Sequence, residues 1–63
     1  MKQRLNQRVG MTDYRAEYEV KGDTVAVTLN GQTREEPIGN QGGLYRARDV
    51  LRMMVRDHEK QAA

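Results

Sequence analysis

Three arginines stand at every fourth position in the C-terminal part of the chain. They are Arg48, Arg52 and Arg56, and a helix places residues four apart on one face. Such a row of guanidinium groups could follow a phosphate backbone, because each contact with a phosphate releases counterions from the nucleic acid. The alternative is a solvated helix face, in which the arginines pair with Asp49 and Glu59. The spacing alone leaves both interpretations open.

Both ends of the sequence are basic, although the formal net charge is only +2. The first ten residues contain three basic side chains and no acidic one, whereas residues 11–43 contain three basic and six acidic side chains. A clustered cationic surface is what a nucleic-acid-binding protein presents to its ligand. The residues predicted to contact nucleic acid are Lys2, Arg4, Arg8, Arg46, Arg48, Arg52 and Arg56.

A glycine pair, Gly42 and Gly43, stands directly before the predicted helix. The free N–H groups of a first helical turn can bind an anion, and Arg46 and Arg48 would assist. No Lys-Ser or Lys-Thr pair follows, so this is not a Walker loop. The alternative is a flexible strand-to-helix connection in which Gly43 is a weak cap.

Residues that could perform catalysis or bind a metal are scarce. The chain has no cysteine and no serine, and His58 is its only histidine. Glu35 and Glu36 are neighbours in a predicted strand, where side chains alternate between faces, so they cannot form a carboxylate pair. We therefore expect no catalytic residue, no metal site, no cofactor and no small-molecule substrate.

The apolar residues indicate a small core that needs a partner. Hydrophobic residues make up 37% of 63 residues, without phenylalanine or tryptophan, and domains of this size usually need additional support. Tyr45 and Met53 are expected on the exposed side of the helix, where they could form an adaptable contact patch for protein. A protein partner or a homodimer is therefore predicted.

The best-defined element of the sequence is a β-hairpin over residues 14–29. Residues 14–21 alternate between apolar and charged side chains, which is typical of a half-buried strand. Gly22-Asp23 fits a type II′ turn. Folding back from that turn aligns apolar pairs at every second position, namely Val20 with Val25, Tyr18 with Val27, and Ala16 with Leu29.

A third strand, over residues 32–37, is predicted after the type I′ turn signal Asn30-Gly31. Its register is open. A two-residue turn would place Gln32, Arg34 and Glu36 on the core face, whereas a shift by one residue would place Thr33 and Glu35 there. Pro37 would end the strand, and Ile38 would anchor it in the core.

The last predicted element is an amphipathic helix over residues 44–60. Its apolar stripe consists of Leu44, Ala47, Val50, Leu51, Met54, Val55 and His58. Residues 1–12, polar and basic, are predicted to form a mobile arm. The fold class is thus α+β, with a three-stranded antiparallel meander (about 13–21, 24–29 and 32–37) packed against one helix, in a single domain over residues 13–63.

Two features of this sheet bear on its partners. The strand over residues 13–21 would keep an unpaired edge, which favours self-association. Glu17 and Glu19 on its outer face would repel phosphate groups, which argues against nucleic-acid binding there. No apolar run approaches the length of a membrane span, no secretory signal is present, and a cytoplasmic location is expected.

These observations predict a small, non-enzymatic accessory or regulatory protein that acts through protein–protein contacts or self-association. The alternative prediction is a nucleic-acid-binding module that uses the basic N-terminal arm and the arginine face of the helix.

Overall fold

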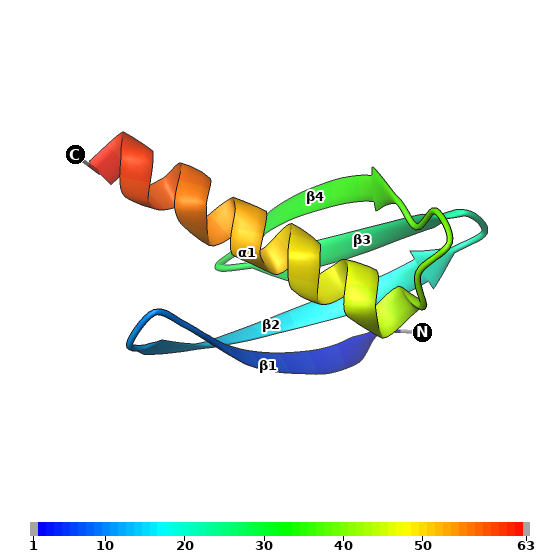
Figure 1. The fold of residues 1–63 in the computed structure, drawn as a ribbon, viewed down its shortest axis with the longest axis horizontal. Helices are drawn as coiled ribbons and strands as arrows, with labels where there is room; N and C mark the ends of the chain where they lie inside the picture. The colour runs from blue at the N-terminus through cyan, green and yellow to red at the C-terminus, as the bar shows by residue number, and fades with distance from the viewer. Residues whose placement is uncertain (1, 63) are drawn as a thin grey trace.

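The computed structural model describes residues 2–62 and the side chains of residues 2–58. Four strands, β1 (Gln3–Val9), β2 (Thr12–Lys21), β3 (Thr24–Leu29) and β4 (Gln32–Pro37), form one antiparallel sheet in the order β1-β2-β3-β4. A single helix, α1 (Gly43–Ala62), lies across one face of that sheet (Figure 1). The predicted α+β class, with an antiparallel sheet and a C-terminal helix, is confirmed.

The expected number of three strands is wrong. Residues 3–9, which belong to the predicted mobile arm, form β1 and pair with β2. Leu5 of β1 is only 2% exposed and belongs to the core. The sequence shows no apolar alternation in this strand, because two glutamines, Gln3 and Gln7, share the face of Leu5.

Two-residue turns join the four strands. Gly10 and Gly22 have φ of 66° and 58° in the first two turns, while Asn30 and Gly31 have φ of 54° and 82° in the third. One positive φ at the first central position agrees with the predicted type II′ turn at Gly22, and two positive values agree with the predicted type I′ turn at Asn30. The β1–β2 turn repeats the pattern of the second.

The register of the sheet resolves the alternatives for β4. The predicted pairs of Val20 with Val25 and Tyr18 with Val27 are confirmed. Strand β4 pairs Val27 with Arg34, so the two-residue turn is the correct alternative. Because Val27 faces the core, Arg34 and its neighbours at alternate positions face α1 as well.

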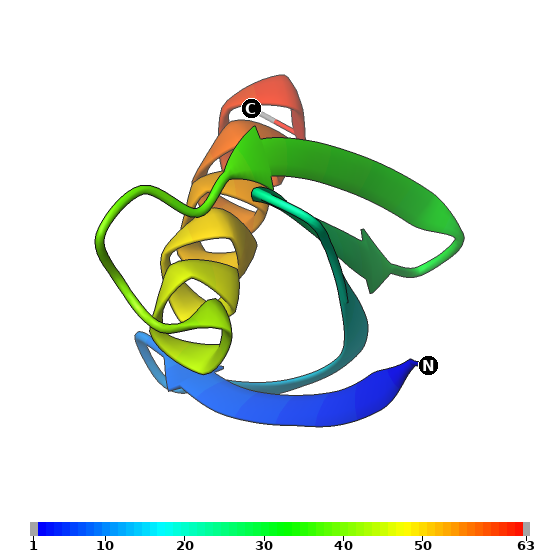
Figure 2. The same ribbon diagram turned by 90° about the vertical axis from the view of Figure 1, so that its right-hand side faces the viewer.

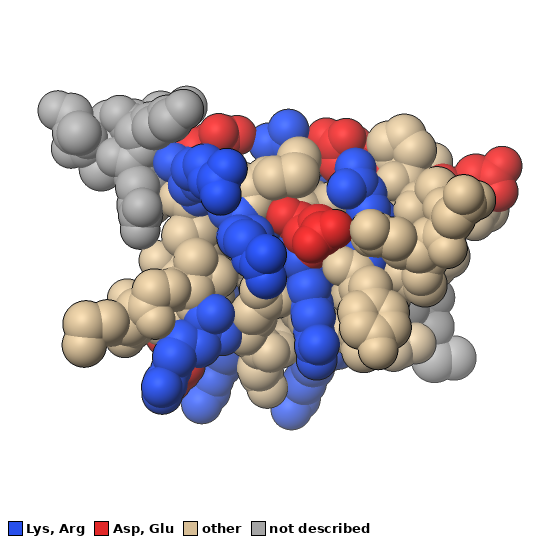
Figure 3. Space-filling model, viewed as in Figure 1, with Lys and Arg blue, Asp and Glu red and all other residues tan. Residues whose placement is uncertain are grey.

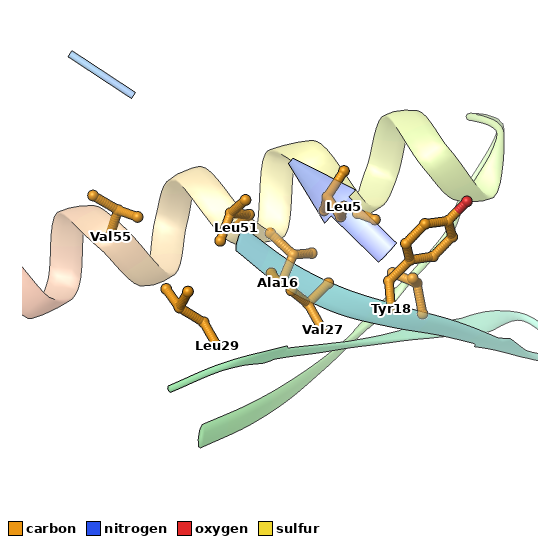
Figure 4. Close-up of a cluster of buried hydrophobic side chains, with 10 residues drawn as sticks. Leu5, Ala16, Tyr18, Val27, Leu29, Leu51 and Val55 are labelled. Carbon is orange, nitrogen blue, oxygen red and sulfur yellow. The ribbon is translucent and has the colours of Figure 1, made fainter. Parts of the chain in front are cut away.

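The sheet curls around α1, as Figure 2 shows in the view along the helix. Helix α1 packs mainly on β3 and also contacts β1, β2 and β4. Figure 4 shows side chains of the helix and of the strands pointing toward one another. The buried apolar cluster consists of Leu5, Ala16, Tyr18, Val25, Val27, Leu29, Ala47, Val50, Leu51 and Val55.

Two predictions about single residues in the core have different outcomes. Ile38 packs against the buried cluster, as expected, and its N–H donates to the carbonyl oxygen of Asp23 at 2.8 Å. His58, predicted on the apolar stripe, is exposed. It lines a surface hollow with Gln32, Thr33 and Arg34 of β4, so polar side chains and not apolar ones surround it on the side of the sheet.

The open edges of the sheet differ from those expected. Strand β2 has neighbours on both sides, so the prediction that it keeps an unpaired edge is wrong. The edge strands are β1 and β4. No helix among residues 2–62 is long and apolar enough to cross a membrane.

Candidate nucleic-acid interface

The arginine row lies on the side of α1 that faces away from the sheet. Arg48, Arg52 and Arg56 are all exposed, whereas Ala47 and Leu51 of the same turns are fully buried. In Figure 3, basic side chains form an oblique band along α1. Successive members of the row are separated by about 6 Å along the helix axis, since each residue rises 1.5 Å.

Arg34 of β4 differs from the arginine row because it forms ion pairs with acidic side chains. Its Nε donates to Oε2 of Glu36 at 2.9 Å, and its Nη1 donates to Oδ2 of Asp57 at 2.8 Å. These hydrogen bonds, first to Glu36 and then to Asp57, raise the pKa of Arg34 above its ordinary value. Arg34 therefore connects β4 to α1 and is not available to a ligand.

Arg46, which was predicted to contact nucleic acid, is also engaged within the protein. Its Nε donates to the carbonyl oxygen of Pro37 at 2.8 Å. Its two terminal nitrogens lie 4.0 Å from carboxylate oxygens of Glu36 and Asp49. The side chain thus attaches the first turns of α1 to the end of β4, and its charge is balanced by two acidic neighbours.

The three arginines of the row have no such partners. Within residues 2–58, none of them lies within 4.0 Å of a carboxylate oxygen in any ion pair of the structure. Asp49, one of the two partners considered from the sequence, pairs with Arg46 instead. The side chain of Glu59, the other one, lies outside the described residues. Among the side chains that the structure describes, the row is therefore a set of three exposed cations without an acidic partner.

A shallow hollow of about 390 Å³ lies beside the N-terminal half of the row. Tyr45, 65% exposed, stands at this hollow, while Met53 is half-buried and lies outside it. An exposed aromatic ring next to guanidinium groups can stack on a base or on an aromatic side chain. The residues that line the hollow are Gln41, Gly42, Tyr45, Arg48, Asp49 and Arg52.

The glycine pair at the start of α1 has a packing role. The carbonyl oxygen of Gly42 accepts the first helical hydrogen bond, from the N–H of Arg46 at 3.0 Å. A Cβ atom on Gly43 would lie 2.6 Å from Cγ2 of Val20, so glycine is needed there for close contact with β2. The first turn of α1 contains no acidic residue. Anion binding by these two glycines stays a prediction.

Lys2, directly before β1, and the basic residues of β1 lie on the opposite side of the molecule. Leu5 faces α1, and neighbouring side chains of a strand point to opposite faces, so Lys2, Arg4 and Arg8 lie on the outer face of the sheet. Nε of Arg8 also pairs with Oδ1 of Asp13 at 3.0 Å. The structure thus divides the predicted set of basic residues into two separate surfaces.

The outer surface also contains Arg15, which the alternation of residues 14–21 places on the outer face of the sheet but which is not among the predicted binding residues. Arg15 of β2 lies beside Asn6 of β1 in the register, and it lines a broad hollow of about 790 Å³ together with Lys2 and Arg4. The sequence does not show that β1 pairs beside Arg15 and adds its own basic side chains to the same face.

Comparisons of the chain with known protein families, curated proteins and solved structures find no match.

Proposed function

We propose that this protein is a small non-enzymatic module that binds nucleic acid through the exposed face of α1. The observation that carries the proposal is the contrast among its arginines. Arg34 and Arg46 are neutralised by carboxylates, whereas the row of Arg48, Arg52 and Arg56 has no acidic partner within residues 2–58.

The chemistry of this face fits a single-stranded phosphate backbone. Three guanidiniums in a line can each neutralise one phosphate. Tyr45 at one end of the row supports stacking with a base, which every base allows and which therefore gives little sequence preference. Contacts of this kind hold the strand without reading it, so the binding is expected to be largely independent of sequence.

The proposal is tested by the salt dependence of binding to a fluorescent oligothymidine. Neutralising three phosphates of a single strand predicts a slope of about −2 for the logarithm of the association constant against the logarithm of salt concentration, or roughly a 20-fold loss between 50 and 200 mM salt. No binding at 50 mM salt would overturn the proposal.

Variants distinguish binding by the arginine row from attraction by the net charge of the protein. Arg52→Ala should weaken binding and reduce the slope by about 0.7. Arg15→Ala, which removes the same charge from the outer face of the sheet, is the matched control and should leave the slope unchanged. Tyr45→Ala should weaken binding to single strands, while Met11→Ala, at a fully exposed turn position, should not. Equal effects of Arg52→Ala and Arg15→Ala would mean that net charge alone is responsible.

A protein contact is the second candidate function, and the exposure of Tyr45 beside the 390 Å³ hollow favours it. An aromatic ring flanked by arginine is typical of the centre of a protein interface. In that case, Tyr45→Ala would abolish capture of a protein and salt would have little effect. Sedimentation at increasing concentration tests self-association, and a constant monomer mass would exclude it.

A further inference from the structure

Strand β1 presents an open edge that carries only basic and neutral side chains on its outer face. It has one neighbour, β2, on one side and none on the other among the described elements. An unpaired edge is a template for another strand, because its outward N–H and C=O groups lack ladder partners.

The register shows which residues offer these groups. The β1–β2 turn closes on Val9 and Thr12, and the closing pair of a two-residue hairpin is hydrogen-bonded. Hydrogen-bonded and non-bonded pairs then alternate along the ladder. It follows that Arg4, Asn6 and Arg8 direct their backbone groups toward the open edge, and these same residues have their side chains on the outer face of the sheet.

We infer that the open edge of β1 binds an extended acidic peptide segment as a fifth strand. Residues of the added strand opposite Arg4 and Arg8 would also point to the outer face. Carboxylates there would form cross-strand ion pairs with Arg4 and, in competition with Asp13, with Arg8. The 790 Å³ hollow provides room for these side chains. Its lining includes Lys2, Arg4 and Arg15, and these three cations outnumber its one carboxylate, that of Glu17 opposite Arg4. The recognised pattern is an acidic residue, two positions later a polar residue, and two positions later another acidic residue.

Intervening positions of that peptide would face the side of the sheet that α1 covers. There they would lie beside Leu5 and Gln7, and Gln7 has a buried Oε1 atom that lacks a hydrogen-bond partner in the structure. Apolar or amide-bearing residues suit these positions. Main-chain hydrogen bonds would supply the affinity, and the alternate side chains would supply the specificity.

A second copy of the chain fits this edge poorly. Symmetric antiparallel pairing that uses the full strand must centre on Leu5 or on Asn6. Pairing centred on Leu5 places Lys2 of one copy opposite Arg8 of the second copy. Pairing centred on Asn6 places Arg4 of one copy opposite Arg8 of the second copy. Like charges directly opposite each other destabilise a strand pair, so the same residues that attract an acidic peptide oppose a β1–β1 dimer.

The test is an NMR titration of the full chain with three synthetic nine-residue peptides that alternate valine with glutamate, with lysine or with serine. The glutamate peptide should protect the amides of Arg4, Asn6 and Arg8 from hydrogen exchange and leave those of Leu5 and Gln7 unchanged. It should bind at least about tenfold more tightly than the lysine peptide. Equal binding of all three peptides would overturn the proposal.

Backbone and charge variants separate strand addition from simple attraction. Asn6→Pro removes one outward N–H, which an edge strand tolerates, and should abolish binding, whereas Asn6→Ala should retain it. If Asn6→Pro does not fold, the double change Arg4→Glu and Arg8→Glu provides the second test, since it should reverse the preference toward the lysine peptide. Binding of the glutamate peptide that survives both changes would overturn the inference.

Two further measurements exclude other occupants of the edge. Oligothymidine that displaces the glutamate peptide would show that the edge binds phosphate. A concentration-dependent dimer that protects the β1 amides without any peptide would show that the occupant is a second copy. Either result would overturn the proposal. Arg52→Ala should leave peptide binding unchanged, so peptide binding at the β1 edge and nucleic-acid binding at the α1 face are tested independently.

Discussion

Gly43 at the start of α1 and Val20 at the end of β2 are in direct contact, and a Cβ atom on Gly43 would lie 2.6 Å from Cγ2 of Val20. Carbon atoms normally pack at about 3.5–4.0 Å. This contact sets how closely the helix approaches the sheet at its N-terminal end. It therefore also positions Tyr45 and the first arginine of the row relative to β2.

Gly43→Ala should lower the free energy of unfolding by about 1–2 kcal/mol, which is the usual cost of overpacking. A loss of stability would be informative, because replacing glycine by alanine inside a helix otherwise raises the free energy of unfolding by about 1 kcal/mol. Gly42→Ala is the matched control, since a Cβ atom there would meet only Tyr45 at an ordinary 3.6 Å. Urea denaturation of both variants measures the difference.

The double variant Val20→Ala with Gly43→Ala tests whether the clash is responsible. Removing the valine side chain should recover much of the lost stability, so the two changes should be non-additive. A Gly43→Ala variant as stable as the wild type would contradict the close contact.

Leu5→Ala should destabilise the protein by about 2–4 kcal/mol, the cost of truncating a buried leucine. That cost is a large part of the stability of a domain this small. Thermal melting followed by circular dichroism gives the measurement, with Met11→Ala as a control that should melt like the wild type. A small effect of Leu5→Ala would instead support a mobile arm at the N-terminus.

Arg34→Ala should lower the melting temperature by a few degrees, because it disconnects β4 from Asp57 of α1. The difference from the wild type should shrink in 1 M salt, where exposed ion pairs are screened. Arg8→Ala is the control. It breaks a pair of similar length whose two side chains are 71% and 72% exposed, against 36% for Arg34, and should have a smaller effect.

Gly10→Ala should destabilise the β1–β2 hairpin by about 1–2 kcal/mol, because φ at this position is 66° and alanine is strained there. Met11→Ala, at the second central position of the same turn where φ is not positive, is the control and should leave the stability unchanged. Hydrogen exchange at β1 amides locates the effect. Equal stability of the Gly10→Ala and Met11→Ala variants would show that the turn adapts.

The extent to which the fold is predictable follows from where the apolar side chains lie. Strands β2 and β3 were predicted with the correct register because Val20, Val25 and their neighbours form apolar pairs. Strand β4 has no apolar side chain before Pro37 at its end. Arg34 faces α1, where it forms an ion pair with Asp57. An ion pair between residues 23 positions apart leaves no periodic signal.

The candidate site was predictable in part for the same reason. The spacing of the arginine row depends only on the helix, so the sequence was sufficient to place Arg48, Arg52 and Arg56 together. The side of the molecule taken by Arg4 and Arg8 depends on β1. That strand is defined by one buried leucine and by Gly10, whose turn resembles the one at Gly22.

Each strand of the sheet pairs with its neighbour in the sequence through a turn of two residues, and this has a kinetic consequence. The loops that must close are short, so little chain entropy is lost before native contacts form. Chains in which most contacts are local fold fast, and for this topology a time of about milliseconds or less is expected. The edges of β1 and β4 and the uncovered apolar face would then be exposed together only briefly before α1 docks, which limits aggregation of newly made chains.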